Sequence, residues 1–342
     1  MRAIVIDRFG GPEVLEQRDV AMPEPSSDQV RVRVRTCGVC RHDLLTRAGA
    51  FPNIALPRIL GHQICGVVDA VGDDVAELAV GDRVLSLVYD TCGRCRACRG
   101  GRETLCAERP RFIGEDIDGG YADHVVAGVR SWVRIPEGVD DLQGAVLTCT
   151  LGTSFHAIVG RGAAEAGETA LVTGATGGVG LHALKVLRAI GVRSIAVTSS
   201  SAKVPLLEEA GADHVVVSEA GAFRDAAKQL TEGAGPDLVV EIVGGDSIHE
   251  SLRTVRFGGR VVVVGNVEGS TATIRPAHLI LKEVSLLGTK AIPRLEMERL
   301  LSLVERGVLT PSIGEAVPLE DVRDAHLAIA NNQTDGRLVL TL

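Results

Sequence analysis

Four cysteines lie close together in the run TCGRCRACRGGRETLC, and their spacing indicates metal binding. Cys92, Cys95, Cys98 and Cys106 follow the pattern C-x2-C-x2-C-x7-C. Four thiolates so spaced can converge on one tetrahedral ion, and a closed sulfur set favours zinc or an iron–sulfur centre. The alternatives, disulfides or free thiols, suit such a short cysteine-rich segment less well. A four-thiolate zinc site has no open position, so we interpret residues 90–110 as a structural lobe and expect the chemistry elsewhere.

Three further candidate ligands lie far apart in the sequence. They are Cys40 in CGVCRHDL, His62 in GHQICG and Cys149 in LTCTLGT. Two thiolates and one imidazole would leave the fourth zinc position open to water or substrate, which is the pattern of a catalytic site. The spacing alone does not show that the three converge, because a His beside Gly is more often structural and Cys149 could be a core thiol.

A glycine-rich loop follows a predicted strand and opens a predicted helix in LVTGATGGVGLHALKVL. Small residues let the backbone turn tightly beside a pyrophosphate, and the helix N-terminus offers free N–H groups to it. Read from Ala175, the spacing A-x-G-x-x-G is close to G-x-G-x-x-G and predicts dinucleotide binding. The predicted binding residues of this loop are Gly174, Ala175, Thr176, Gly177, Gly178, Val179 and Gly180.

The next predicted strand ends in VTSSSAK, which bears on the choice of cofactor. An acidic residue there would bind the ribose hydroxyls of NAD and repel a 2′-phosphate. This chain has hydroxyls and a cation instead, from Thr198, Ser199, Ser200, Ser201 and Lys203. That combination suits a 2′-phosphate, so we predict NADP(H) rather than NAD(H). The alternative is a serine-rich turn that caps the following helix.

The hydrophobic pattern of the elements that must position these groups changes along the chain. Residues 1–153 contain short alternating strands separated by Gly, Pro and Asp, which predict a β-rich domain. In QVRVRVRTC the arginines alternate with valines and are expected on the solvent face. Over residues 154–289, Val-rich runs alternate with helix-length segments, which predicts an α/β doubly wound parallel sheet. Residues 290–342 read as two amphipathic helices and a closing strand that rejoin the first domain.

Composition narrows the classes of partner. The 342-residue chain has a net charge of −8, which argues against nucleic acid as the main partner. We expect no membrane association, because we find no apolar run of the ~20 residues that span a bilayer. The N-terminus enters a strand-like pattern without a signal-peptide layout, and eight cysteines without such a signal indicate a reducing, cytoplasmic setting.

The chain resembles the zinc-dependent medium-chain dehydrogenase/reductase (alcohol dehydrogenase) superfamily over essentially its whole length. The resemblance implies a GroES-like catalytic domain, formed by both chain ends, around a Rossmann cofactor domain. It implies that Cys40, His62 and Cys149 bind a catalytic zinc and that Asp43 orients the ligating His62. Together with a structural zinc in the four-cysteine lobe, it implies two Zn²⁺ ions per chain.

Two residues depart from the family pattern near the catalytic zinc. The usual proton-relay hydroxyl is replaced by His42, which we predict to relay the proton, and a usual Glu is replaced by the neutral Gln63. Arg41 matches a position where some members place a pyrophosphate-binding arginine; the alternative is a solvated loop residue. We also predict cofactor contacts from Thr153, Val243, Gly265 and Asn266.

The leading functional prediction is zinc-dependent hydride transfer between NADP(H) and a small-molecule alcohol/carbonyl pair. The rival comes from VTGATGGVGLHA and VVVVGNV, which resemble the branch of NADPH-dependent acryloyl-CoA (enoyl) reductases and quinone oxidoreductases. That branch reduces a C=C bond conjugated to a carbonyl. A non-catalytic NADPH-binding sensor is the third reading. We also expect a homodimer or homotetramer, mainly from the resemblance, with support from the apolar strand VSLLGTK at a sheet edge.

Overall fold

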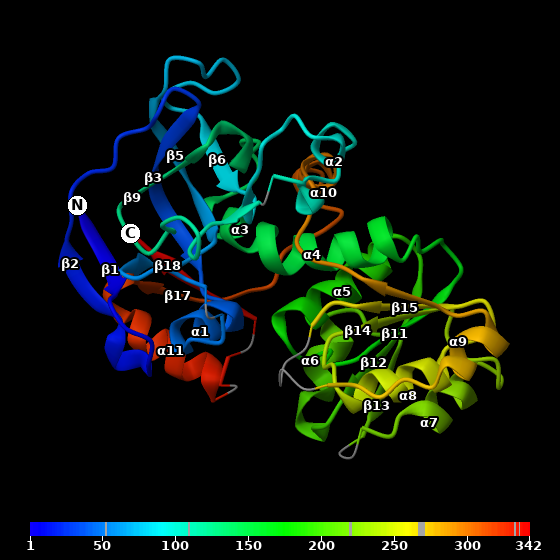
Figure 1. Ribbon diagram of the computed structural model, residues 1–342. Coiled ribbons are helices and arrows are strands. Elements are labelled where there is room, and N and C mark those ends of the chain that lie inside the picture. The colour runs from blue at the N-terminus through cyan, green and yellow to red at the C-terminus, as the bar shows by residue number, and fades with distance from the viewer. Residues whose placement is uncertain (52, 109, 219–220, 266–270, 332, 335) are drawn as a thin grey trace. The chain divides into compact units, whose positions relative to one another are not determined.

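The computed structural model describes residues 1–51, 53–108, 110–218, 221–265, 271–331, 333–334 and 336–342. The chain forms two compact units (Figure 1). The first comprises Met1–Cys149, Ala291–Arg306 and Pro311–Leu342, and the second comprises Thr150–Lys290 and Gly307–Thr310. Both ends of the chain therefore belong to the same unit.

The first unit is built around strand β3 (Gln29–Gly38) of a seven-stranded sheet. The sheet has the order β10-β6-β5-β3-β18-β17, and β9 also pairs with β3. The valines of β3 are at most 2% exposed while the arginines between them lie on the other face, as the alternation predicts. The other strands are β5 (Gln63–Val71), β6 (Arg83–Ser86), β9 (His124–Gly128), β10 (Trp132–Arg134), β17 (Ile313–Pro318) and β18 (Arg337–Thr341).

Smaller elements complete the first unit. A three-stranded sheet joins β2 (Glu16–Asp19), β1 (Arg2–Ile6) and β4 (Arg58–Ile59), and β7 (Tyr89–Asp90) pairs with β8 (Arg111–Phe112). One hydrophobic core collects residues from the N-terminal strands and from the C-terminal helix and strand, so both ends stabilise the same core. The helices are α1 (Arg41–Ala48), α2 (Arg96–Arg99), α3 (Asp141–Val146), α10 (Arg294–Glu305) and α11 (Val322–Ala330).

The second unit contains a six-stranded, wholly parallel sheet, which confirms the predicted doubly wound fold. Its order is β13-β12-β11-β14-β15-β16, so the direction of winding reverses between β11 and β14. The strands are β11 (Thr169–Val172), β12 (Arg193–Thr198), β13 (His214–Val217), β14 (Leu238–Glu241), β15 (Arg260–Val263) and β16 (Ser285–Gly288). The helices are α4 (Gly152–Phe155), α5 (Gly178–Ala189), α6 (Val204–Glu209), α7 (Arg224–Leu230), α8 (Asp246–Thr254) and α9 (Pro276–Lys282).

One helical run, Asp141–Arg161, is long and apolar enough to cross a membrane by length and composition. The expectation that no apolar run reaches this length was therefore wrong. However, 78% of its most apolar window is buried within the fold, as in a core helix of a globular protein. The run is not uniformly α-helical, because Leu147–Leu151 and His156–Arg161 form π-helical turns.

Candidate functional site

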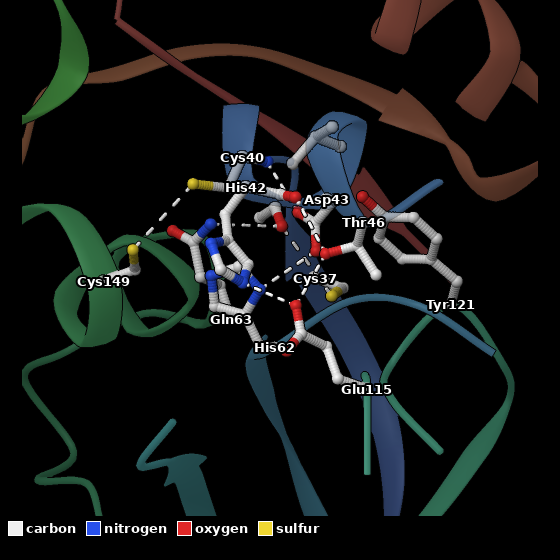
Figure 2. A network of polar contacts seen from close by, with 12 residues as sticks. Cys37, Cys40, His42, Asp43, Thr46, His62, Gln63, Glu115, Tyr121 and Cys149 are labelled. Atoms are coloured by element: carbon white, nitrogen blue, oxygen red, sulfur yellow. Dashed lines mark hydrogen bonds and ion pairs between the residues drawn. The ribbon is translucent and has the colours of Figure 1, made fainter. Parts of the chain in front are cut away.

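The three separated ligand candidates converge in the first unit (Figure 2). The ligand atoms of Cys40, His62 and Cys149 all lie within 4.8 Å of one another, and the two sulfurs are 3.9 Å apart. Tetrahedral zinc with bonds of ~2.3 Å would place two thiolates ~3.8 Å apart. Both the donor chemistry and the spacing therefore fit a zinc ion held by three protein ligands.

Three different local structures bring these ligands together. Cys40 is the N-cap of α1, and His62 immediately precedes β5. Cys149 lies in the middle of the π-helical turn Leu147–Leu151. Single π-helical turns inside α-helices are frequent at functional sites because they displace one side chain relative to the regular helical path.

Asp43 connects two of the ligand-bearing elements. One carboxylate oxygen accepts a hydrogen bond from the backbone N–H of Cys40 at 2.8 Å, and the other lies 2.9 Å from His62 Nδ1. Asp43 and His62 are only 3% and 1% exposed. Burial disfavours protonation of His62, but the nearby charge of Asp43 prevails and raises the His62 pKa to about 10. With Nδ1 engaged by Asp43, Nε2 of His62 remains for a metal.

A buried cation lies near the two thiols. The Cys149 thiol holds the pKa of Cys40 well below its usual value despite burial, and the positive charge of Arg337 acts in the same direction. Arg337 is 8% exposed and donates to the Val39 carbonyl at 2.6 Å. Its Nε has no hydrogen-bond partner within the described ranges. The site therefore favours the thiolate form of Cys40, the form that binds metals, whereas contact with Cys40 and burial raise the pKa of Cys149.

Arg47, His326 and Tyr121 form a buried hydrogen-bonded network in the first unit. His326 contacts Arg47 through Nδ1 and the Tyr121 hydroxyl through Nε2, at 3.2 Å in each case. A guanidinium can only donate, so Nδ1 of neutral His326 accepts and Nε2–H donates to Tyr121. Burial lowers the pKa of His326 to about 4, which keeps it neutral near pH 7. Burial raises the pKa of the Tyr121 hydroxyl, and the negative charge of Asp43 acts in the same direction.

His42 lies beside the ligands but its partner was not foreseen. Its Nε2 is 2.7 Å from Oε1 of Glu115, which also accepts from the Thr46 hydroxyl at 2.7 Å (Figure 2). The imidazole stacks on both Phe51 and Phe112, with ring centroids 4.8 Å apart in each pair. Burial alone would raise the pKa of Glu115, but the contacts with His42 and Thr46 outweigh it and lower that pKa.

Gln63, for which the resemblance leads us to expect a Glu, is completely buried beside His62. Its side-chain nitrogen donates to the Gly38 carbonyl at 3.4 Å. In the part of the chain that is described, its oxygen Oε1 has no hydrogen-bond partner. A neutral side chain with an unpaired acceptor oxygen therefore lies next to His62 among the described residues.

The four-cysteine lobe also has the geometry of a metal site. The ligand atoms of its cysteines lie within 4.8 Å of one another, and the sulfur of Cys92 is 3.9 Å from that of Cys98 and 3.5 Å from that of Cys106. Backbone N–H groups of Ala107 and Cys98 point at the Cys95 sulfur and lower the Cys95 pKa to about 6. All eight cysteines of the chain are described, and none forms a disulfide. The closed sulfur set fits a structural zinc.

The glycine-rich loop connects β11 to the N-terminus of α5 in the second unit, as expected for a dinucleotide-binding turn. Gly174 has φ of +57°, a conformation that favours glycine. A Cβ on Gly180 would lie 2.5 Å from the Gly174 carbonyl oxygen, so only glycine allows this close approach of helix to loop. Gly177 is the N-cap of α5. These features fit a pyrophosphate near the helix N-terminus.

The remaining predicted cofactor residues fall at several places. Ser199 and Ser200 follow the carboxyl end of β12, where the Ser200 N–H donates to the Thr198 hydroxyl at 3.2 Å, and Lys203 ends the next short turn. Val243 and Gly265 follow the carboxyl ends of β14 and β15, and Thr153 lies on α4. Arg41 begins α1 of the first unit and donates to the Ile329 carbonyl at 3.1 Å. Asn266 lies outside the described residues.

Comparisons with known proteins match nearly the whole chain. An alcohol dehydrogenase GroES-like domain matches residues 26–137, and a zinc-binding dehydrogenase domain matches residues 178–306. An acryloyl-coenzyme A reductase from Sulfurisphaera tokodaii is 34% identical over 342 residues, covering 99% of each chain. An alcohol dehydrogenase from Geobacillus stearothermophilus is 33% identical over 344 residues, again covering 99% of each. The crystal structure of AibC superposes with a TM-score of 0.95 at 42% identity, covering 100% of this chain and 95% of that one.

Proposed function

Because the chain belongs to the zinc-binding medium-chain dehydrogenase/reductase superfamily, we propose that it is a zinc-dependent NADP(H) oxidoreductase that interconverts an alcohol and an aldehyde or ketone. The convergence of two thiols and one imidazole, which leaves a fourth metal position for substrate, carries this proposal. Zinc bound there would polarise a carbonyl oxygen or acidify an alcohol. The nicotinamide cofactor would carry the hydride.

The protein's own residues have separate tasks in this proposal. Cys40, His62 and Cys149 hold the metal, and Asp43 fixes both the Cys40 backbone and the His62 ring. His42 moves the proton of the substrate oxygen, a task that suits an imidazole near neutral pH. Its contact with Glu115 supports the assignment, because the carboxylate can hold the ring in one orientation.

Reduction of a conjugated C=C bond in an enoyl thioester is the second candidate. It is favoured by the name of the relative at 34% identity, an acryloyl-coenzyme A reductase, and by the resemblance of the glycine loop to that branch. In this reaction the hydride would go to the β-carbon, and the proton would go to the α-carbon rather than to the carbonyl oxygen. The proposed relay by His42 would then matter less.

Further features of the proposal concern the cofactor and the assembly. We propose NADP(H) over NAD(H) because the Thr198–Lys203 segment carries hydroxyls and a lysine but no carboxylate. A second, structural zinc in the four-cysteine lobe would complete two ions per chain. We further propose a cytoplasmic homodimer or homotetramer in which the edge strand β16 pairs with a partner.

Turnover assays test the proposal directly. Zinc-loaded protein would be assayed with NADPH against aldehydes, ketones and short 2-enoyl-CoA thioesters, with Cys149→Ala as the control that lacks a metal ligand. Reduction of an aldehyde or ketone that is lost in Cys149→Ala is the expected result. Reduction of the enoyl thioesters alone would select the second candidate. No turnover with any of them would leave a non-catalytic NADPH-binding protein.

A further inference from the structure

Glu241, the last residue of β14, carries a carboxylate that is completely buried in the second unit. Across the described ranges, no basic side chain forms a salt bridge with it. Its two oxygens instead accept five hydrogen bonds. The donors are the hydroxyls of Thr173 (2.9 Å), Ser247 (2.9 Å) and Ser251 (2.5 Å) and the backbone N–H groups of Val243 and Gly244 (3.0 Å each).

Such a carboxylate is costly to bury unless its partners are fixed around it. Desolvation of a charged group is repaid only by well-placed donors, and donors that point at it lose their own partner if it is removed. The five donors come from three segments that are separate in the sequence: the end of β11, the turn after β14, and α8. Glu241 therefore joins these segments at one point.

Glu241 lies at the part of the sheet where a dinucleotide is expected to bind. The order of the sheet reverses between β11 and β14, and ligands of open α/β sheets bind beyond the carboxyl ends of the strands at such a switch point. Glu241 lies at the carboxyl end of β14, and Thr173 directly precedes the glycine loop. Glu241 and Thr173 therefore adjoin two segments that are predicted to contact the dinucleotide, namely the glycine loop and Val243.

The contacts act mainly on the backbone of these two turns. The Thr173 hydroxyl accepts a hydrogen bond from the Ile242 N–H at 2.9 Å and donates one to the Glu241 carboxylate. Three consecutive N–H groups after β14 are therefore bound by Thr173 and Glu241. Gly244, the last of these three residues, has φ of +85°, so the backbone leaves the extended conformation of the strand there. A Cβ on Gly174 would lie 3.2 Å from a methyl group of Val243, so the two turns also pack closely.

We infer that Glu241 is a positioning residue for the cofactor, whose carboxylate sets the backbone of the turns after β11 and β14 in the conformation that binds the dinucleotide. The inference rests on the proposed nicotinamide cofactor. Glu241 itself, being fully buried, does not touch the ligand. Its effect is on cofactor affinity, and the metal site in the first unit does not depend on it.

The test compares the two ends of one strand. Glu241→Gln keeps the shape but leaves one acceptor oxygen where there were two. Asp237→Asn is the matched control, because Asp237 precedes β14 at its opposite end and accepts from the Thr169 N–H at 2.8 Å and from Arg256 at 2.5 Å. For each variant, Kd for NADPH and for NADH by fluorescence titration, Tm, zinc content and steady-state constants would be measured.

We expect Glu241→Gln to raise Kd and KM for NADPH about tenfold, the equivalent of roughly one hydrogen bond. Zinc content and kcat at saturating cofactor should stay close to wild type, and the ratio of NADPH to NADH affinity should not change. Asp237→Asn should lower Tm without changing Kd. A folded Glu241→Gln with wild-type Kd would overturn the inference, as would an equal loss of affinity in Asp237→Asn.

If Glu241→Gln does not fold, a second pair of variants tests whether Glu241 positions the cofactor-binding turns. Thr173→Val removes the hydroxyl that links Ile242 to Glu241, and Thr173→Ser retains it. Weaker NADPH binding in Thr173→Val that is restored in Thr173→Ser supports the inference, and equal binding by both variants contradicts it. Wild-type protein that binds neither NADPH nor NADH would show that the proposed function is wrong, and the inference would fall with it.

Discussion

The imidazole Nε2 of His42 lies 2.7 Å from the carboxylate of Glu115, within reach of the converging metal ligands. The ring centroids of His42 and His62 are 5.5 Å apart. Glu115 comes from a segment 73 residues later in the chain and also binds Thr46, one turn after His42 in α1. The carboxylate therefore fixes the orientation of the imidazole relative to α1.

If His42 is the proton relay, His42→Ala should lower kcat for alcohol/carbonyl conversion about a hundredfold, the lower end of general acid–base effects. Zinc content and NADPH affinity should stay near wild type, because His42 is not among the converging ligands. His42→Thr restores the family hydroxyl and should recover part of the rate. Steady-state kinetics, metal analysis and NADPH titration measure these effects.

An opposite pattern would remove the relay role. Weaker NADPH binding in His42→Ala, with kcat and the shape of the pH–rate profile retained, would mean that His42 packs against the cofactor instead. Glu115→Gln is the companion variant, because it keeps a hydrogen-bond acceptor for His42 but removes the charge. It should lower kcat less than His42→Ala does.

Removal of ligands from the two metal sites should have different consequences. Cys92→Ser opens the four-thiolate lobe and should lower Tm, since a structural metal contributes directly to folding stability. Cys149→Ala should abolish turnover with a smaller effect on Tm. Metal analysis of the wild type should give about two zinc ions per chain, and about one in each variant. Full activity in a preparation with a single zinc would contradict the assignment of the sites.

Much of the fold could be predicted because its signals are local. Apolar runs that alternate with helix-length segments predicted the parallel strands, and the alternation of valine and arginine predicted the buried face of β3. The short cysteine spacing of the lobe also lies within one segment. In contrast, the sequence pattern does not predict the helical run Asp141–Arg161, because small and hydroxyl-bearing residues interrupt its apolar residues, although most of it is buried.

The rest of the site depends on contacts that no local pattern contains. Glu115 stands in an acidic surface-like segment, and only the fold brings it to His42. His326 lies on an amphipathic helix, where a core histidine is the simplest reading, and its partners Arg47 and Tyr121 are 279 and 205 residues away. Arg337 is a strand residue whose charge reaches Cys40 only because β18 pairs with β3.

Cofactor preference can be changed at the end of β12. Ser200→Asp introduces a carboxylate that should repel a 2′-phosphate and accept from ribose hydroxyls, so affinity should shift from NADPH toward NADH. Ser200 is suitable because it lies just beyond the strand and is partly exposed. Fluorescence titrations with both reduced cofactors measure the shift, with Ser200→Asn as an uncharged control. Tighter binding of NADH by the wild type would refute the predicted preference.

The sheet edge predicts the assembly. Strand β16 ends the parallel sheet, and Ile280 and Leu281 on the neighbouring helix α9 are 71% and 75% exposed. An unpaired edge beside exposed apolar residues favours pairing with a second copy. Light scattering should give a dimer or tetramer at micromolar concentration. Leu286→Pro, which removes a backbone donor from β16, should shift the population toward monomer, and a wild-type monomer would contradict the prediction.

The buried hydrogen-bonded network of Arg47, His326 and Tyr121 predicts that the stability of the protein depends on pH. His326 has a pKa of about 4 in the folded protein, because of burial, against 6.5 for a free histidine. The unfolded chain therefore binds more protons between these values. Stability supported by neutral His326 is fully present above about pH 6.5 and is lost as the pH falls toward 4. Between pH 7 and pH 5 the loss from this residue should be about 2 kcal/mol.

His326→Gln isolates this contribution. A glutamine can accept from Arg47 and donate to Tyr121 as the histidine does, but it does not titrate. Urea denaturation of both proteins at a series of pH values, with free zinc held constant, measures the difference. Because acid also protonates metal ligands in both proteins, only the difference between their slopes reports on His326. The wild type should lose stability more steeply than the variant below pH 6.5, whereas parallel curves would show that His326 is not held neutral in the folded protein.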